Sequence, residues 1–462
     1  ALTAGQDCVF IGHYAGSSIT SAGGGTLDGA IAIGREAMLG SASTTNAASN
    51  TIAIGQNSVK AITTAADVIG IGNSALAAVT TGGYNVAIGS SAGLNLTTGT
   101  DNTFVGHAAG SAASTDTTNA IQNVYIGSTS GRYMDDGIQA LDGTAADAND
   151  GSNNVAVGHR ALRVITDGDK NVVLGSSAAL ALTTSSKNII IGYQAMASAL
   201  SGSDGNVMIG NEAGVNLYDN ATYNIAIGEN AFIAGNADNV GNIAIGYAAL
   251  DGTTTNAHTG TIAIGHNALT AVTSGTDNLG VGAYSLQSLT TGSNNLAMGY
   301  GALRQHTTGT HNIAIGVGAM DGTDAGNNSA GSTHNMFIGF NAGGGDWADT
   351  ASTYNVGIGN YVMDGTLDEA LNNTALGYGS LGSITSGDNN VAVGFSAGDA
   401  LTSGSSNVAI GMNSMGAGQD IDKCVAIGYG ALYAANDGAD TDGTIAIGAN
   451  ALEGLTVGEG NT

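Results

Sequence analysis

Residues 85–101 read NVAIGSSAGLNLTTGTD, and variants of this stretch recur along the whole sequence. Each copy contains a glycine preceded by an aliphatic residue, which is Gly89 here. Twenty-four such glycines are present, and 11 of the 23 spacings between them are 17 residues long. The longer spacings indicate loop insertions into one small unit repeated many times. We number the positions of the repeat from 1 to 17, with Asn85 at position 1 and Gly89 at position 5.

The residue types along the repeat predict a short strand, a corner and a narrow return. Positions 2 and 4 are nearly always Val, Ile, Leu or Met, and we expect both to point into a coil while position 3 points out. The glycine at position 5 permits a corner that a residue with a Cβ would resist. Position 8 is Ala in 18 copies and Ser in five, as expected in a narrow interior. A second apolar pair follows, such as Leu76 and Val79, before Thr-Thr-Gly closes the turn.

Position 1 is Asn in 17 of the 24 copies. Stacked one above another, these side chains would form an amide ladder that satisfies corner backbone groups and neighbouring amides. Cys8 and Cys424 occupy the same position, and we interpret them as small buried substitutes for Asn. The predicted ladder includes Asn85, Asn102, Asn188, Asn242, Asn312 and Asn407.

The sequence therefore predicts an all-β fold, a parallel β-roll or β-solenoid of about 24 coils with a 17-residue repeat. A helical fold is disfavoured because Gly and Thr recur every few residues and the apolar spacing follows no 3.6 period. We expect a single continuous solenoid over residues 1–462, and more coils or a cap beyond both ends, as in a segment of a longer fibre. Loop insertions are expected near residues 39–50, 111–122, 132–153, 321–334, 343–354 and 433–443.

Composition excludes several classes of function. The chain has 76 Gly and no Pro, and its net charge of −27 should repel nucleic acid and anionic membrane surfaces. No stretch approaches 18 continuous apolar residues, so this segment is not expected to insert into a membrane. We predict no partner among nucleic acids.

Three copies of the motif, NVAVGHRA at 154–161, NIAIGENA at 224–231 and NVAIGMNS at 407–414, look like the head repeat of trimeric autotransporter adhesins. Similar repeats occur in bacteriophage tail fibres, and the resemblance covers nearly the whole chain. It implies a left-handed parallel β-roll in which three chains pack side by side. It also implies binding to host surfaces, through a glycan or a protein, and an extracellular place on a cell or virion.

The expected outward position 3 also favours association. It is Ala in 14 copies and Gly in three, and leaving the larger residues in water would cost about 1.5–3 kcal/mol each relative to burying them. We predict a parallel homotrimer. The seven larger residues at position 3 are Phe10, Phe104, Tyr125, Val173, Ile190, Met208 and Phe337.

No motif predicts a catalytic, cofactor-binding or metal-binding residue. Residues 70–75, GIGNSA, match a dinucleotide fingerprint only because Gly70 replaces the usual Ala of the repeat. Acidic residues at 135–136, 147–150 and 437–442 are interpreted as solvated turns, with calcium binding as the alternative. The candidates for ligand-facing aromatic side chains are Trp347 and Tyr354.

Position 6 is often aromatic or His, which predicts a broken stripe that either packs at the corner or stacks against sugar rings or another chain. Its members are His13, His107, His159, His266, Tyr193, Tyr247, Tyr300, Tyr378 and Tyr429. We predict a non-enzymatic structural or adhesive fibre segment that mediates surface attachment. The alternatives are a polysaccharide-cleaving tailspike, whose paired carboxylates would have to come from Asp in loops, and an ice-binding solenoid with rows of Thr.

Overall fold

The computed structural model describes residues 7–19, 27–40, 48–111, 120–132, 151–199, 201–233, 239–252, 259–323, 331–348, 350–434, 441–455 and 460. Within these ranges the chain forms strands and turns and no α-helix, so none of them contains a helix able to cross a membrane. Contacts divide the chain into two compact units, Ala1–Asn230 with Ala234–Asn239, and Ala231–Ile233 with Val240–Thr462. Each unit is a parallel β-solenoid, which confirms the predicted fold class; the single continuous solenoid and the trimer stay predictions.

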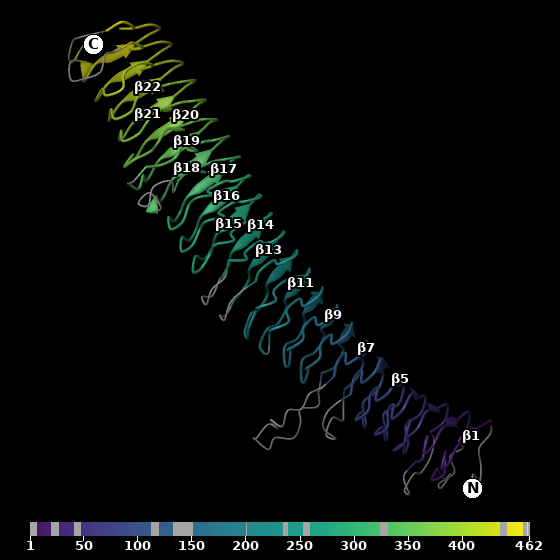
Figure 1. The fold of residues 1–462 in the computed structure, drawn as a ribbon. Coiled ribbons are helices and arrows are strands. Elements are labelled where there is room, and N and C mark those ends of the chain that lie inside the picture. The colour runs from purple at the N-terminus through teal and green to yellow at the C-terminus, as the bar shows by residue number, and fades with distance from the viewer. Residues whose placement is uncertain are drawn as a thin grey trace. The chain divides into compact units, whose positions relative to one another are not determined.

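The first unit stacks 12 described strands in parallel, each paired with the next strand along the chain (Figure 1). The register places equivalent repeat positions opposite each other, as where Ala87 faces Phe104. The strands are β1 (Val9–Ile11), β2 (Ile31–Ile33), β3 (Ile52–Ile54), β4 (Ile69–Ile71), β5 (Val86–Ile88), β6 (Thr103–Val105), β7 (Val124–Ile126), β8 (Val155–Val157), β9 (Val172–Leu174), β10 (Ile189–Ile191), β11 (Val207–Ile209) and β12 (Ile225–Ile227).

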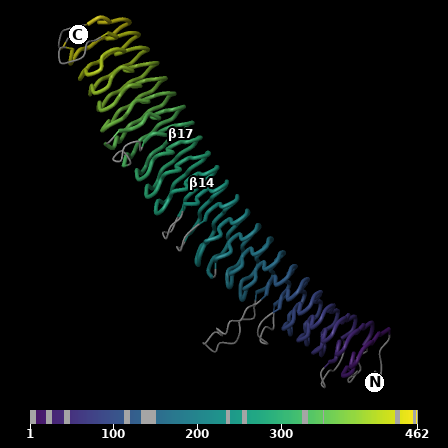
Figure 2. The backbone as a smooth tube through the Cα atoms, in the orientation of Figure 1, coloured from purple at the N-terminus to yellow at the C-terminus, as the bar shows by residue number. Residues whose placement is uncertain are grey.

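The second unit repeats this arrangement with 12 further described strands, and the tube trace shows its coils as regular rungs (Figure 2). The strands are β13 (Ile243–Ile245), β14 (Ile262–Ile264), β15 (Leu279–Val281), β16 (Leu296–Met298), β17 (Ile313–Ile315), β18 (Met336–Ile338), β19 (Val356–Ile358), β20 (Thr374–Leu376), β21 (Val391–Val393), β22 (Val408–Ile410), β23 (Val425–Ile427) and β24 (Ile445–Ile447).

The predicted direction of the strand side chains is wrong. Position 3 is buried in the coil, whereas positions 2 and 4 are partly or largely exposed, as Val86 and Ile88 are on either side of buried Ala87. A three-residue strand puts one side chain on one face and two on the other. The interior is narrow, so it takes the single side chain. Of the seven large residues at position 3, Phe104, Tyr125, Val173, Ile190, Met208 and Phe337 are therefore buried and Phe10 is partly buried.

A size exchange inside the coil accommodates these large residues. Position 9 lies against position 3, and wherever position 3 is Phe, Tyr or Met, position 9 of the same coil is Gly. An added Cβ on Gly131 would collide with the ring of Tyr125, and one on Gly343 would lie 2.8 Å from Phe337 Cδ1. The five pairs are Phe10 with Gly16, Phe104 with Gly110, Tyr125 with Gly131, Met208 with Gly214 and Phe337 with Gly343. In most other coils Ala at position 3 faces Leu, Met or Phe at position 9, as close packing requires.

The corner at position 5 requires glycine for two reasons. Gly89 has φ of 139°, a conformation that residues with a Cβ rarely adopt. A Cβ there would also collide with the carbonyl oxygen of Gly106 in the next coil. The corner glycines therefore let successive coils approach closely enough to stack.

Buried asparagines connect the coils along one corner. Asn85 Oδ1 accepts hydrogen bonds from the backbone nitrogen and from Nδ2 of Asn102, both at 3.0 Å, and Asn85 Nδ2 donates to Gly99 O at 2.7 Å. Equivalent bonds join Asn171 to Asn188 in the first unit and Asn295 to Asn312 in the second. Asn242 accepts from the backbone of Thr261, and Asn407 accepts from that of Cys424 at 2.9 Å, so the ladder continues through residues other than Asn.

Candidate interaction surfaces

The outward side chains at positions 2 and 4 of the strands form an apolar surface on each unit, which we call the outer strand face. Apart from Thr103 and Thr374, every residue at these positions is Val, Ile, Leu or Met. Seven of the aliphatic residues in each unit are at least 36% exposed: Val9, Ile11, Ile88, Ile126, Val172, Ile189 and Ile227 in the first, and Met298, Ile358, Leu376, Val391, Ile410, Ile445 and Ile447 in the second.

The outer strand face is a continuous patch and not a scatter of single exposed residues. Ile88 is 40% exposed, and Ile71 and Val105 occupy the same position on the neighbouring strands, so aliphatic side chains follow one another rung by rung. Covering a side chain exposed to this extent is worth on the order of 1 kcal/mol. Because contiguous apolar patches of this kind are rare on monomeric proteins, the outer strand face has the properties of a contact surface.

Aromatic rings follow the corner of the second unit, beside the outer strand face. Tyr247 stacks on His266 at a ring-centroid distance of 5.2 Å, and Tyr378 stacks on Phe395 at the same distance. At the two coils where position 6 is Ala283 or Asn360, the ring comes from position 7 instead. The corner stripe consists of Tyr247, His266, Tyr284, Tyr300, Val317, Phe340, Tyr361, Tyr378, Phe395, Met412 and Tyr429.

The same corner of the first unit is mostly polar. Position 6 there is Arg35, Gln56, Asn73, Ser90 and Ser176 in five of the coils, with Tyr193 as its one large aromatic residue. His13, His107 and His159 belong to this corner and are separated from one another by polar residues. The sequence predicted a broken stripe along both halves of the chain. Polar residues interrupt it in the first unit, whereas in the second unit each coil from Tyr247 to Tyr429 contributes an aromatic or aliphatic side chain.

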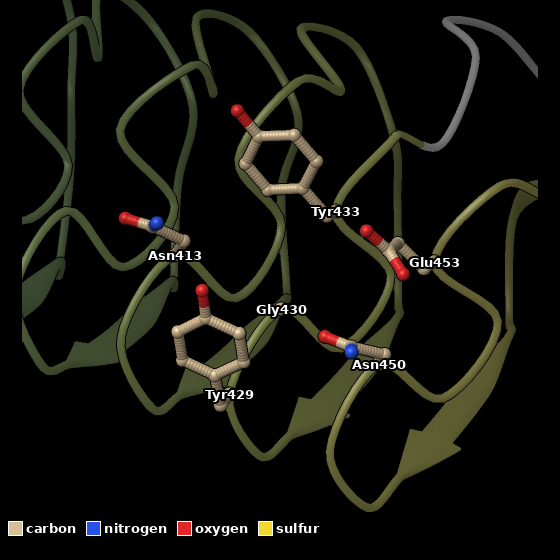
Figure 3. Close-up of a pocket in the computed structure, with 6 residues that line it drawn as sticks. All are labelled: Asn413, Tyr429, Gly430, Tyr433, Asn450 and Glu453. Carbon is tan, nitrogen blue, oxygen red and sulfur yellow. The ribbon is translucent and has the colours of Figure 1, made fainter.

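A small hollow opens beside the corner stripe near β22 to β24. Position 7 is Asn413 in one coil and Asn450 two coils later, but it is Gly430 in the coil between them, so a side chain is missing from the row. The hollow has a volume of about 210 Å³. In Figure 3 the two asparagines lie on opposite sides of Gly430, with the ring of Tyr433 above it and the ring of Tyr429 on the side of Asn413. Its lining is Asn413, Tyr429, Gly430, Tyr433, Asn450 and Glu453.

The two predicted ligand-facing aromatics have opposite environments. Trp347 is completely buried, its Nε1 donates to Gly343 O at 3.0 Å, and its ring packs edge-on against Phe337, so the prediction that it faces a ligand is wrong. It fills the coil interior because Gly343 leaves space beside Phe337. Tyr354 is 57% exposed and stacks on His334, which stacks in turn on His311.

His306 is buried inside the second unit at position 12, where most coils carry an aliphatic residue. Its Nδ1 lies 3.1 Å from Thr323 Oγ1, and its Nε2 lies 3.1 Å from Nδ2 of the ladder residue Asn312. Both ring nitrogens therefore lie within hydrogen-bond distance of a polar side chain. Burial lowers the pKa of His306 to about 4, so this group is neutral and structural at pH 7.

Metal binding is the candidate chemistry that depends on acidic residues in the loops. Among the described residues, no group of three or more His, Cys, Asp or Glu side chains is placed to hold a metal ion. The candidate calcium ligands Asp135, Asp136, Asp147, Asp150, Asp437 and Asp440 lie outside the described residues, as do the insertion residues 41–47, 112–119, 133–150, 324–330 and 435–440.

The threonine pairs contribute hydrogen bonds inside the stack. Thr80 Oγ1 donates to Thr97 O at 3.2 Å, and Thr290 Oγ1 donates to Thr307 O at 3.0 Å in the second unit. The first hydroxyl of these pairs is therefore directed to the next coil and not to an external surface.

Sequence reasoning missed the outer strand face and part of the corner stripe. The exchange between positions 3 and 9, as in Tyr125 and Gly131, was the signal that would have placed position 3 inside. Phe340 and Phe395 occupy position 6, so a search for any aromatic residue would have found them. No protein-family model matches this chain, and no curated protein matches it.

Proposed function

We propose that this chain is a non-enzymatic structural and adhesive fibre segment that assembles as a parallel homotrimer and mediates attachment at a cell or virion surface. The observation that carries the proposal is the outer strand face, an apolar surface that recurs on every described strand of both units. A chain with a net charge of −27 has ample polar residues to cover a surface that needs to remain in water.

The regular register supports parallel association of identical chains. Equivalent positions of successive strands are paired without a shift, for example Val172 with Ile189 and Leu174 with Ile191. A copy related by rotation about an axis parallel to the stack therefore presents a matching aliphatic row to its neighbour at every rung. The number of three chains is supported by the resemblance of the repeat to the adhesin heads.

The attachment part of the proposal is supported by the corner stripe. Its rings are not needed inside the coil, and Tyr300 and Tyr378 are about half exposed. Exposed aromatic residues are enriched where proteins bind other molecules, because they offer a large apolar area together with a polar group.

The mass of the native particle tests the assembly. We expect about 135 kDa by native mass spectrometry and sedimentation, three times the 45.0 kDa chain. The double variant Val172→Asp/Ile189→Asp places two unpaired charges on the outer strand face, and we expect it to sediment as a monomer with an unchanged β-sheet circular dichroism spectrum.

The matched control is Asn73→Asp/Ser176→Asp, which adds the same charge at the polar corner of the same unit. This control should remain a trimer. A monomeric wild-type chain, or identical masses for the two double variants, would show that the outer strand face does not hold chains together.

A further inference from the structure

We infer that the hollow at Gly430 is a binding site for one neutral sugar residue of a surface glycan; this inference rests on the proposed attachment function and specifies its ligand. The site is formed by three successive coils of the second unit. They contribute Asn413 from the first coil, Tyr429, Gly430 and Tyr433 from the second, and Asn450 with Glu453 from the third. Its volume of about 210 Å³ suits a single sugar ring and not a polypeptide segment.

The hollow is held open by its backbone. Gly430 N donates to Met412 O at 3.0 Å, and Asn450 N donates to Tyr429 O at 2.7 Å, so the three coils are fixed at this level. Gly430 has φ of 61°, and an added Cβ would lie 2.6 Å from Asn450 Oδ1. The missing side chain is therefore what creates the space between Asn413 and Asn450.

Two partly exposed tyrosines lie at the rim of the hollow. Tyr429 is 52% and Tyr433 is 42% exposed, and each ring has a phenolic hydroxyl at its tip. The ring of Tyr433 lies over Gly416 of the preceding coil, where a Cβ would collide with it. Glycine at this position leaves room for the Tyr433 ring, which packs against this coil.

The polar groups match the hydroxyls of a sugar. Asn413 and Asn450 each offer an amide donor and acceptor, and Glu453 offers a carboxylate acceptor. A pyranose presents apolar C–H faces to aromatic rings and hydroxyls to planar amides and carboxylates at its edge. The lining contains no Lys or Arg, and together with the net charge of −27 this disfavours anionic sugars.

The test uses the intact particle and four probes. Saturation-transfer NMR is recorded with the methyl glycosides of glucose, galactose and N-acetylglucosamine, and with N-acetylneuraminic acid as the anionic probe. We expect at least one neutral glycoside to bind with a Kd on the order of 1–10 mM, the strength of a small open site, and no binding of the anionic sugar. Binding of N-acetylneuraminic acid alone, or of no probe, would overturn the inference.

One variant closes the hollow with little change to the backbone. In Gly430→Asn the new residue is the one found at position 7 in both flanking coils, where Asn413 has φ of 54° and Asn450 of 52°. We expect sugar binding to weaken at least tenfold. The control Gly379→Asn makes the same change at position 7 of another coil, where the nearest atom to the new Cβ is Ser396 Oγ at 3.7 Å, and it should bind as the wild type does.

Tyr433→Ala provides a second variant that removes one of the two rim tyrosines without a change in the glycine. It should also weaken binding tenfold or more, and equal binding by all three variants would refute the site. Particle mass and attachment to cells are measured on the same samples. A trimer that attaches to cells but binds no neutral sugar would rule out this site and leave the fibre proposal intact. A monomer that binds the sugar would rule out the trimer and leave this site intact.

Discussion

The two units use the same coil but differ in the side chains that line its outer corner. In the first unit, Phe104 and Tyr125 fill the interior, while the corner carries residues such as Gln56 and Ser90. In the second unit the interior is mostly Ala facing Leu or Met, with Phe232, Phe337 and Trp347 also buried, and further rings lie outside along the corner stripe. Phe, Tyr and Met at position 3 occur only with Gly at position 9, whereas corner positions change without such a partner, so the corner is where function can differ between the units.

The largest expected effect comes from converting a coil of the first unit to the interior type of the second. Tyr125→Ala should leave a cavity beside Gly131 and lower the free energy of unfolding by about 3–5 kcal/mol. Adding Gly131→Leu recreates the Ala and Leu pair seen at Ala297 and Leu303, and should recover at least about 2 kcal/mol.

Denaturant unfolding of the two single variants and the double variant measures this coupling. Gly131→Leu alone should be destabilising, because the new side chain would overlap the ring of Tyr125. If the two changes had purely additive costs, positions 3 and 9 would not exchange volume and the account of the interior would be wrong.

The next effect concerns a titratable group in the second unit. Position 12 is aliphatic in most coils, as at Leu182 in the first unit and Leu289 in the second, but it is His306 in one coil of the second unit. The pKa of His306 is about 4 when folded and about 6.5 when unfolded, so the unfolded chain takes up the proton first as pH falls. Folding stability should therefore decrease by about 3 kcal/mol between pH 7 and pH 4 through this residue, and should be unaffected by it above pH 7.

The variant His306→Leu isolates the contribution of His306 to the pH dependence. Carboxylates titrate in both proteins, so their contribution cancels when the two are compared. Unfolding free energies measured from pH 7 to pH 4 should diverge, with the variant retaining the stability that the wild type loses. Parallel pH profiles for the two proteins would mean that burial of His306 has no cost on protonation.

The smallest effect on stability, but a large one on attachment, is expected at the corner stripe. Tyr300→Ser/Phe340→Ser/Tyr378→Ser should change the unfolding free energy by about 0.5 kcal/mol or less per site, because the side chains are already exposed. Attachment of labelled particles to cells should fall at least tenfold. The matched change in the first unit, His13→Ser/His107→Ser/His159→Ser, should leave attachment unchanged.

The fold was predictable because its requirements are local and periodic. Only glycine fits the corner that Gly89 makes, and the buried amides of Asn85 and Asn102 satisfy each other, so both positions recur at a fixed spacing. The orientation of the strand was not predictable from alternation, because three residues alternate equally well in either sense. It is decided by the width of the coil, which becomes visible only when positions 3 and 9 are compared.

The candidate sites were predictable in part. Trp347 lies one residue beyond the place of the second apolar pair in its repeat, so it resembles a loop residue although it replaces an interior one. Tyr284 and Tyr361 complete the corner stripe from position 7, which a search at one fixed position omits. The hollow follows from one missing side chain, Gly430 between two asparagines. It could not be recognised from one repeat, because its lining comes from three successive coils.

Site-specific disulfide formation tests most directly whether the outer strand face joins parallel chains in register. In a background of Cys8→Asn/Cys424→Asn, which supplies the usual ladder residue, single cysteines replace Ile88 on the outer face or Ala87 inside the coil. Identical residues near a shared axis can come within the roughly 4–7 Å between Cα atoms that a disulfide needs. We predict linked pairs of chains for Ile88→Cys and single chains for Ala87→Cys. Single chains in both cases, or linkage through Ala87→Cys, would contradict the account.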